Sequence, residues 1–384
     1  MRIAYFTDTY LPQINGVTHT LKKLSDYLVD QNIEHKFFAP EYEDKAFPHS
    51  SNVTRFKSIS LPFYPECRLS LPLYSNLSRA VDNFQPDLIH LTDPLGIGLA
   101  GLKYARERDI PVVSSFHTNF DSYLKYYKME YLEGFLWGFF QWFHSFSEVN
   151  FCPSLATWKV LESKNIRNLR LWSRGVDSFR FDPKYHSLNI RSNLLKADDK
   201  ILFLYVGRLA VEKDLDILMN SIQMINQKDR NRIQFVFVGD GPYAKEMKAL
   251  EEDNVIFTGY LQGQELSSLY ASCDVFVFPS STETFGNVVL EAMSSGLPVI
   301  AVNSGGVVDN VIHSYNGLLC TPRDSVALAD AILKLTDDQS LRKQLASNAR
   351  AYALTKSWDY IFNQLLLDYQ SVLEKSQNLF PETA

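Results

Sequence analysis

The chain has 384 residues, enough for two domains, or at most three, each with its own hydrophobic core. With 46% hydrophobic and 21% charged residues, the composition is typical of a globular enzyme and excludes an intrinsically disordered chain. The net charge of −6 argues against nucleic acid as a partner. The chain opens on a short apolar strand rather than a signal peptide, and no uncharged apolar run approaches about 18 residues, so we expect a cytoplasmic protein.

The four cysteines show no spacing typical of a metal site. Cys152, Cys273 and Cys320 lie in apolar runs and are expected to be reduced core residues, which suits a cytosolic protein. Cys67 lies outside such a run. The sequence therefore predicts no metal site.

Strand and helix patterns alternate through both halves of the chain, which predicts an α/β protein with parallel sheets covered by helices. The first-half strands are predicted at 3–6, 36–39, 88–91, 112–116, 149–153 and 169–172. The polar stretch 183–200 is interpreted as a hinge. Further strands are predicted at 201–206, 234–238, 255–258, 275–278 and 299–302, with a long amphipathic helix at about 358–375. We expect two doubly wound, Rossmann-like domains that face a central cleft, where two substrates could be held away from water.

Two places in the first half could carry chemistry. Gly16 follows the first strand and precedes an amphipathic helix, so its backbone could approach a phosphate closely, although an ordinary strand-to-helix turn explains it equally well. His117 ends the strand at 112–116 and could donate a hydrogen bond to a reacting sugar. Many histidines at strand ends are only structural, so His117 alone does not indicate a function.

Residues 96–101, Gly-Ile-Gly-Leu-Ala-Gly, match the GxGxxG pattern of dinucleotide-binding proteins. That pattern requires glycines directly after a strand and an acidic residue at the end of the next strand. Here Asp93 and Pro94 intervene, and the next strand ends in His117. We therefore interpret these glycines as close helix–sheet packing and expect no dehydrogenase.

The segment 131–151 is densely aromatic, and a helix there would be apolar on nearly every side. Packing into the core is the favoured interpretation. The alternative is a peripheral membrane contact, which the upstream residues Lys125 and Lys128 would support through their positive charge.

In the second half, Arg208 and Lys213 follow the strand at 201–206. Two cations at the carboxyl end of a strand could neutralise a diphosphate leaving group as its negative charge develops. They could instead be surface charges paired with Glu212 or Asp214. Their coincidence with the acidic loop described next favours the first interpretation.

Residues 282–291 are the most informative stretch of the chain. Glu283 lies in the loop after the strand at 275–278, where open α/β sheets bind ligands, and Glu291 lies about one turn into the following helix. Gly286 and Asn287 leave the first N–H groups of that helix facing outward, which favours a phosphate. Because each carboxylate can accept hydrogen bonds from sugar hydroxyls, the stretch predicts a nucleotide-sugar site.

Taken together, these motifs resemble the retaining glycosyltransferases of family 4, which have the GT-B fold. The resemblance covers nearly the whole chain. Its parts are the opening Phe-Thr-Asp-Thr-Tyr-Leu-Pro-Gln-Ile-Asn-Gly-Val, Phe-His-Thr-Asn at 116–119, Arg-Gly-Val-Asp at 174–177, Gly-Arg-Leu to Glu-Lys at 207–213, Val-Gly-Asp-Gly-Pro at 238–242 and the two glutamates. The opening and the Arg-Gly-Val-Asp segment resemble the branch with GDP-mannose-dependent α-mannosyltransferases and sulfoquinovosyl- and glucosyl-diacylglycerol synthases.

The resemblance implies a role for each matching residue. Arg208 and Lys213 would bind the donor diphosphate, which Gly16 would touch from the first domain. Glu291 would hold the ribose hydroxyls, and His117 would hydrogen-bond the donor sugar near the reaction centre. The chain departs from the family at Asp214, where many members have glycine.

The resemblance further implies a role for Glu283 with the backbone of Phe285, Gly286, Asn287 and Val288, which would hold the donor sugar. Tyr260 and Leu261 would contact the nucleotide base through backbone atoms. By the same resemblance, residues 1–182 would be the acceptor domain and 183–360 the donor domain, with the tail at about 361–384 crossing back to the first.

We therefore expect transfer of a hexose from a nucleotide-diphosphate sugar, GDP-mannose or a UDP-hexose, to an acceptor hydroxyl with retained anomeric configuration. The resemblance implies no cofactor and no metal, because the leaving phosphate assists deprotonation of the acceptor. The expected acceptor is a lipid or glycolipid at the inner face of the plasma membrane. Two alternatives stay open: a nucleotide-sugar epimerase of the same fold, and a sugar-binding protein without catalysis. A phosphorylase is disfavoured because nothing marks a pyridoxal-phosphate lysine.

Overall fold

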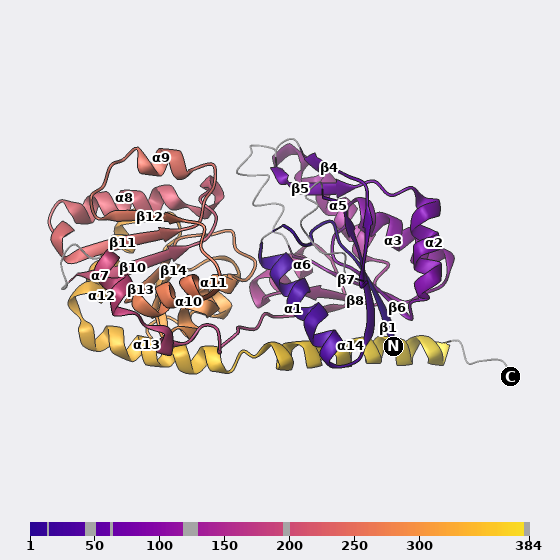
Figure 1. Cartoon of the computed structure of the whole chain (residues 1–384). Helices are drawn as coiled ribbons and strands as arrows, with labels where there is room; N and C mark the ends of the chain where they lie inside the picture. The colour runs from indigo at the N-terminus through magenta and orange to yellow at the C-terminus, as the bar shows by residue number, and fades with distance from the viewer. Residues whose placement is uncertain (14, 43–50, 62–63, 118–129, 195–199, 380–384) are drawn as a thin grey trace. The chain divides into compact units, whose positions relative to one another are not determined.

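The computed structural model describes residues 1–13, 15–42, 51–61, 64–117, 130–194 and 200–379. These residues form two compact units (Figure 1). Unit 1 comprises Met1–Ser173 and the tail from Asp359, and unit 2 comprises Arg174–Trp358. Each unit is built around one parallel sheet, so the predicted pair of Rossmann-like domains is confirmed.

The sheet of unit 1 has the strand order β3-β2-β1-β6-β7-β8-β9, and all neighbouring strands run parallel. A separate antiparallel pair, β4 and β5, follows β3 in the chain. The chain reverses its direction of travel across the sheet between β1 and β6, which is the switch point of this fold. The strands are β1 (Arg2–Phe6), β2 (Glu34–Pro40), β3 (Val53–Phe56), β4 (Ser58–Leu61), β5 (Tyr64–Ser70), β6 (Leu88–Leu91), β7 (Val112–Ser115), β8 (Val149–Cys152) and β9 (Leu169–Leu171).

The last helix of the chain, α14, belongs to unit 1 although unit 2 precedes it. The Tyr27 hydroxyl on α1 donates to Asn363 Oδ1 on α14 over 2.7 Å, and the ring of Tyr27 packs against Phe362. The helices of unit 1 are α1 (Gly16–Asp30), α2 (Tyr74–Phe84), α3 (Gly96–Glu107), the 3-10 turn η1 (Glu130–Leu132), α5 (Glu133–His144), α6 (Leu155–Ser163) and α14 (Trp358–Leu379).

The glycines at the start of α3 are explained by close packing. A Cβ atom at Gly98 would lie 1.7 Å from the carbonyl oxygen of Asp93, and one at Gly101 would lie 2.7 Å from the ring of Phe6 on β1. Only glycine allows the helix to approach the sheet this closely. The interpretation of the GxGxxG match as helix–sheet packing is confirmed.

Unit 2 has the strand order β12-β11-β10-β13-β14-β15, again fully parallel, with its switch point between β10 and β13. Figure 1 shows helices on both sides of this sheet. The strands are β10 (Ile201–Val206), β11 (Ile233–Val238), β12 (Val255–Gly259), β13 (Val275–Phe278), β14 (Val299–Val302) and β15 (Gly317–Cys320). The helices are η2 (Pro183–Tyr185), α7 (Leu188–Leu194), η3 (Val211–Lys213), α8 (Leu215–Asn226), η4 (Arg230–Arg232), α9 (Ala244–Lys248), α10 (Gly263–Ser272), α11 (Asn287–Ser294), η5 (Gly305–Asp309), α12 (Ser325–Asp337) and α13 (Gln339–Leu354).

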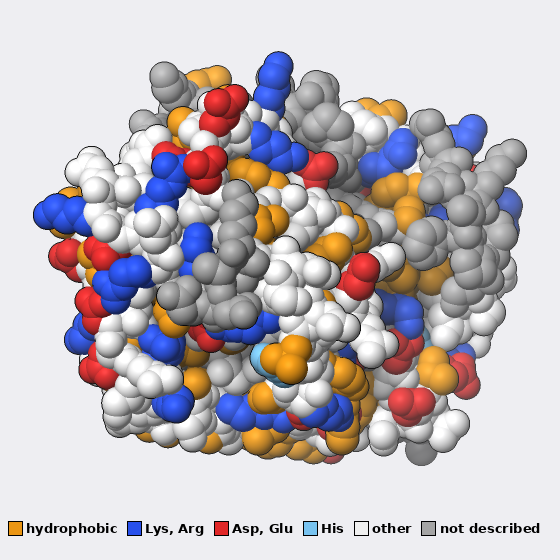
Figure 2. All heavy atoms as spheres, turned by 60° about the vertical axis from the view of Figure 1, so that its left-hand side comes forward, with side chains coloured by type: hydrophobic (Ala, Val, Ile, Leu, Met, Phe, Trp, Pro, Cys, Tyr) orange, Lys and Arg blue, Asp and Glu red, His pale blue; other side chains and the backbone are white. Residues whose placement is uncertain are grey.

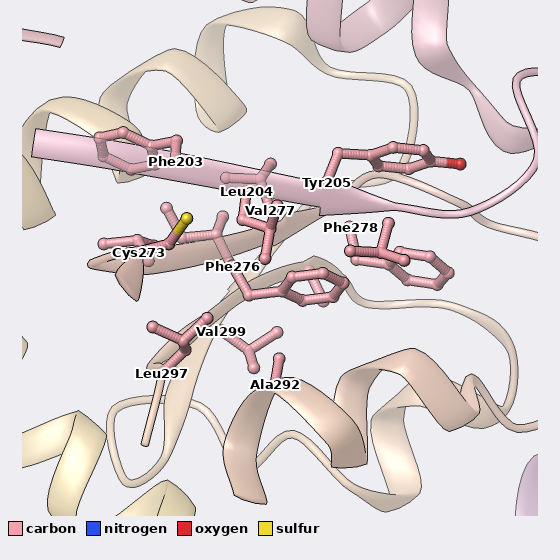
Figure 3. Packing of buried hydrophobic residues seen from close by; sticks show 14 of the residues in the cluster. Phe203, Leu204, Tyr205, Cys273, Phe276, Val277, Phe278, Ala292, Leu297 and Val299 are labelled. Atoms are coloured by element: carbon pink, nitrogen blue, oxygen red, sulfur yellow. The ribbon is translucent and has the colours of Figure 1, made fainter. Parts of the chain in front are cut away.

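The central strands of unit 2 are apolar on both faces because helices cover both sides of the sheet. All residues of β11 and β13 are buried. Figure 3 shows Tyr205 and Phe278 near each other at one end of β10 and β13 and Phe203 at the other end, with the Tyr205 hydroxyl pointing away from Phe203. The rings of Tyr205 and Phe278 stack at 6.1 Å. This packing holds the two strands on either side of the switch point in register.

Every strand expected from the sequence is present, with small differences at the ends. The sequence analysis missed β3, β4 and β5, which lie in a stretch to which no element was assigned, and the short edge strand β15. Each of β3, β4 and β15 has four residues, too few for a clear alternating or apolar pattern.

The hinge expected at 183–200 is wrong for its described residues. Here η2 and α7 pack on unit 2, and the guanidinium of Arg191 on α7 bonds Asp274 Oδ2 over 2.9 Å. The unit boundary lies earlier, between Ser173 and Arg174. Residues 174–182 pack with unit 2, since Phe181 is buried in its core and accepts a hydrogen bond from Ser294 Oγ over 2.7 Å.

The aromatic segment 131–151 is partly buried in the core and partly exposed at the surface. On α5, Trp137, Phe140 and Phe143 are buried, whereas Phe135 is 80% exposed and Trp142 45% exposed. Lys125 and Lys128, which were expected to support a membrane contact, lie outside the described residues. The favoured core interpretation is therefore correct for one face of the helix only.

On the face of the molecule in Figure 2, Lys and Arg side chains are interspersed with Asp and Glu. Cys152, Cys273 and Cys320 are buried free thiols, as expected. None of the helices in the described part of the chain combines the length and the apolar character needed to cross a membrane.

We expect Phe362→Ala to lower the free energy of unfolding by about 3–5 kcal/mol, because Phe362 is 1% exposed and its removal leaves a cavity between α14 and unit 1. The matched control is Leu367→Ala on the same helix, which is 56% exposed and should change stability by less than about 0.5 kcal/mol. Urea denaturation followed by circular dichroism measures both. Equal losses would contradict the assignment of α14 to the core of unit 1.

Candidate nucleotide-sugar site

Two loops meet at the switch point of unit 2, one after β10 and one after β13. Lys213, in η3, forms an ion pair with the carboxylate of Glu283 in the β13 loop. Their side chains are 17% and 20% exposed. Burial alone would lower the pKa of the Lys213 ammonium, but Glu283 and the neighbouring acidic groups raise it above its ordinary value. Lys213 is therefore a fixed positive charge at the end of the sheet.

Arg208 lies in the same loop, two residues after β10. Its guanidinium is 3.9 Å from the carboxylate of Glu212 and its side chain is 25% exposed. The hydroxyl of Tyr205 donates to the backbone oxygen of Arg208 over 3.1 Å, at the end of the stacked rings seen in Figure 3. Burial raises the pKa of Tyr205, so the phenol stays a neutral donor and fixes the start of this loop.

Asp214 ties the two loops together. Its carboxylate accepts hydrogen bonds from the backbone N–H of Ser281, at 2.9 Å, and from the Ser281 hydroxyl, and it also lies 3.4 Å from Arg323 Nε. Its backbone is left-handed, with φ of 51°. Glycine adopts such a φ without strain, and aspartate is one of the few other residues that tolerate it. The departure noted in the sequence thus keeps the backbone shape and adds a tether.

The β13 loop is also held from the side of β14. The Gly306 N–H donates to the carbonyl oxygen of Glu283 over 2.7 Å. A Cβ atom at Gly306 would lie 1.9 Å from the Thr284 oxygen, and one at Gly305, whose φ is 64°, would lie 2.5 Å from the Glu283 oxygen. These two glycines therefore let the backbone that carries Glu283 lie directly against η5.

The N-terminus of α11 follows this loop. Gly286 is the N-cap in a left-handed conformation, with φ of 81°, and no side chain caps the helix there. Phe285 is buried in the core, which anchors the turn, while Asn287 and Val288 are partly exposed. The first N–H groups of a helix have no partners within the helix, so this terminus can donate to an anionic ligand.

Glu291 lies on α11 and is partly buried. Its Oε2 accepts a hydrogen bond from the hydroxyl of Tyr270 on α10 over 3.1 Å. Burial raises the pKa of Glu291 to about 7, although the Tyr270 hydrogen bond and the charge of Arg180 both act to lower it.

Tyr260 and Leu261 follow β12, next to β11 in the sheet. The N–H of Gly239, after β11, donates to the oxygen of Gly259 over 2.8 Å, so the ends of the two strands are joined. Tyr260 is 54% exposed and Leu261 is partly buried against the core. Within the described residues, no group of three or more His, Cys, Asp or Glu side chains is arranged to hold a metal ion.

The comparisons with known proteins match this architecture unit by unit. The family model "Glycosyltransferase Family 4" matches residues 14–180, and "Glycosyl transferases group 1" matches residues 187–352. A GDP-mannose-dependent alpha-mannosyltransferase of Corynebacterium glutamicum is 30% identical over 99% of this chain and 91% of its own length. The chain belongs to the family 4 glycosyltransferases.

Two further comparisons are consistent with this family assignment. An alpha-monoglucosyldiacylglycerol synthase of Streptococcus pneumoniae is 29% identical over 78% of this chain and 71% of its own. Among solved structures, Anabaena HepE in complex with UDP-glucose superposes with a TM-score of 0.75 at 22% identity, covering 97% of this chain and 99% of that one. The fold is GT-B.

The other two residues singled out from the sequence lie in unit 1. Gly16 is the first residue of α1, and Asn15 caps this helix by accepting from the N–H of Thr18 over 2.9 Å. His117 follows β7 and is buried; its Nε2 is 2.8 Å from Ser115 Oγ, and its ring packs edge-on against Trp172.

Sequence reasoning singled out Lys213 and Glu283, which the structure brings together in unit 2, but missed the residues that hold them. Tyr270 gave no signal because it lies in the last turn of α10 with an ordinary apolar spacing. Gly305 and Gly306 did carry a signal: adjacent glycines directly after a buried strand mark a close backbone approach.

Proposed function

We propose that this family 4 glycosyltransferase moves a hexose from a nucleotide-diphosphate sugar to an acceptor hydroxyl with retention of the anomeric configuration. The observation that carries the proposal is the grouping of Arg208, Lys213 and Glu283 at the switch point of unit 2, beside the N-terminus of α11. Phosphate needs cations and unpaired N–H donors, and a sugar needs fixed acceptors, so the combination suits a diphosphate-linked sugar.

In this proposal Arg208 and Lys213 bind the donor diphosphate. Cleavage of the bond between the anomeric carbon and the diphosphate oxygen leaves negative charge on the phosphate, and two positioned cations stabilise that charge. They supply the charge that a metal ion supplies in other transferases, so the proposed reaction needs neither metal nor cofactor. Gly16, from unit 1, is proposed to touch the same diphosphate.

Glu291 accepts hydrogen bonds from the ribose, and Glu283 accepts them from the donor sugar. The backbone N–H groups at the start of α11 complete the sugar site. The base is contacted by the backbone that follows Gly259. The residues in these roles are Glu283, Phe285, Gly286, Asn287, Val288 and Glu291 for sugar and ribose, and Tyr260 and Leu261 for the base.

The anomeric configuration is retained if the acceptor oxygen attacks the anomeric carbon from the same face of the donor sugar from which the diphosphate departs. The acceptor proton then passes to the departing phosphate oxygen, and no separate base is needed. His117 is proposed to donate a hydrogen bond to the donor sugar near this centre.

The named relatives support the finer choices. One is called GDP-mannose-dependent, which supports GDP-mannose as donor, and another is called an alpha-monoglucosyldiacylglycerol synthase, which supports a lipid or glycolipid as acceptor. A UDP-hexose is the other donor that we propose. We propose that the outer face of α5 brings the enzyme to the lipid as a peripheral protein at the inner face of the plasma membrane. Trp142 shares a surface pocket with Lys103, Arg106 and Glu107 on α3. Because Lys103 pairs with Glu107 over 3.8 Å, the positive charge proposed to meet an anionic bilayer there is that of Arg106. Tyr131 and Phe135 extend the exposed aromatic surface.

We expect Arg208→Ala to lower kcat/KM by about 10²–10³-fold, because a group that stabilises the leaving charge is lost. The matched control is Arg230→Ala. Arg230 lies in the same unit in an exposed ion pair with Asp253, so its loss should leave kcat/KM unchanged. The assay follows release of nucleotide diphosphate with and without acceptor. Acceptor-independent release would favour an epimerase, and no release by wild-type protein would favour a sugar-binding protein. Full activity in Arg208→Ala would show that the donor site is misplaced.

We expect the affinity for the true nucleotide sugar to fall about tenfold between pH 8 and pH 6. The pKa of Glu291 is about 7, so its carboxylate loses its charge as the pH falls through this range, and the neutral acid accepts hydrogen bonds less well. Intact nucleotide sugars keep a constant charge from pH 6 to 8, which makes calorimetric titration suitable. Glu291→Gln should bind weakly at both pH values. An equally steep pH dependence in that variant would rule out Glu291 as the cause.

We expect the wild-type protein to co-sediment with anionic vesicles and the Phe135→Ser/Trp142→Ser variant to stay in solution, because the variant loses exposed aromatic area that can enter the bilayer interface. Trp137 is unsuitable for this test because it is buried. The matched control is Phe179→Ser, which removes an aromatic side chain that is 82% exposed in unit 2. Equal sedimentation of all three proteins would contradict the contact through α5.

A further inference from the structure

An ion pair between Asp214 and Arg323 connects the candidate site to the loop after the edge strand β15. Nε of Arg323 lies 3.4 Å from Oδ1 of Asp214, and the two side chains are 61% and 4% exposed, respectively. Asp214 directly follows Lys213 in the chain. The same carboxylate accepts the N–H of Ser281, two residues before Glu283. The Asp214–Arg323 pair is therefore attached to both loops that carry the Lys213–Glu283 pair.

Both residues of the pair have a left-handed backbone, with φ of 51° at Asp214 and 58° at Arg323. This conformation is unfavourable for residues other than glycine, and most of all for those without a short polar side chain. The backbone at Arg323 is nevertheless held firmly, because the side chain of Asp324 caps α12 and α12 packs against α8. Glycine would make both turns without strain, which indicates that the two side chains have a role of their own.

The carboxylate of Asp214 is not used by the helix that it begins. Asp214 is the N-cap of α8, a position where aspartate usually accepts a hydrogen bond from the first turn of its own helix. Within the described residues its side chain makes no cap of this kind and instead contacts Ser281 and Arg323. A carboxylate with so little access to water is weakly screened, so its charge acts strongly on its surroundings.

The charges around these loops are balanced in pairs. Among the described residues, the ion pairs that involve the two loops are Arg208 with Glu212, Lys213 with Glu283, and Arg323 with Asp214. Together the three pairs carry no net charge, and without Arg323 they would carry one negative charge. A diphosphate that approaches Lys213 would then meet the uncompensated carboxylate of the next residue, and like charges repel.

We propose that Arg323 is a positioning residue that acts through Asp214: it compensates the charge of this carboxylate, which can then tie the two loops together without repelling the donor diphosphate. The inference rests on the proposed function, because it takes Arg208 and Lys213 as the diphosphate site. It deepens that function by giving the loop after β15 a part in recognising the charged portion of the donor. Arg323 needs no direct contact with the donor for this role.

The test is a double-mutant cycle in the full-length protein with Arg323→Gly and Asp214→Gly. Glycine accepts the left-handed backbone at both positions, so the variants keep their turns. The affinity is measured by calorimetric titration with whichever of GDP and UDP binds the wild type more tightly. We expect Arg323→Gly to weaken binding about three- to tenfold, because one partly screened unit charge is left uncompensated near the diphosphate. In the Asp214→Gly background the same change should leave the affinity unchanged.

Two further variants separate charge from structure. Arg323→Lys keeps the positive charge, so its affinity should stay within about twofold of the wild type. The matched control is Glu251→Gly, which replaces another exposed, charged residue with a left-handed backbone, φ of 49°, before β12, and should leave the affinity unchanged.

An equal loss from Arg323→Gly with and without Asp214 would mean that Arg323 contacts the donor directly, and it would overturn the inference. Failure of Arg323→Lys to retain binding, or full affinity in Arg323→Gly, would overturn it too. These outcomes leave the proposed function standing, since the wild type still binds the nucleotide. Binding of neither nucleotide to the wild type would instead overturn the proposed diphosphate site, and the inference with it.

Discussion

The ion pair between Lys213 and Glu283 is the contact around which the candidate site is organised. It joins the loops that follow the two strands at the switch point of unit 2, and both side chains are held in place before any ligand arrives. Asp214 and Gly306 hold the same loops from either side. A ligand that binds here meets positive and negative groups whose positions are already fixed, so little ordering of side chains is needed on binding.

The two cations of the candidate site, Lys213 and Arg208, differ in how closely a carboxylate approaches them. Lys213 is balanced by Glu283, while Arg208 lies beside the more buried Glu212 at the longer distance of 3.9 Å. In the proposed function, the donor diphosphate would bring its negative charge to these two cations. The second carboxylate oxygen of Glu283 is the acceptor that the proposed function assigns to hydroxyl groups of the donor sugar.

The fold was largely predictable because parallel strands between two layers of helices leave a clear pattern of apolar runs. Strands such as β10 and β13 are continuous buried runs and were located correctly. The edge strands β3 and β15 are four residues long, and their pairing is decided by neighbours distant in the sequence, which no local pattern reports. The prediction of a hinge at 183–200 was wrong because α7, although polar in composition, is fixed to unit 2 by Arg191 and by the partly buried side chains of Ile190 and Leu194. Among the site residues, Arg208, Lys213, Glu283 and Glu291 could be found from strand ends. Tyr270 could not, because its importance depends on which side chain it touches.

The position of α14 bears on how the protein forms during synthesis. Unit 1 begins with β1 but is completed by a helix that starts at Trp358, and the hydrogen bond between Tyr369 and His90 spans 279 positions of the chain. Unit 2 is encoded entirely between these two parts. On the ribosome, the middle of the chain can therefore assemble while the part made first still lacks its final helix. The amino-terminal part of the enzyme acquires its complete core only when translation is nearly over.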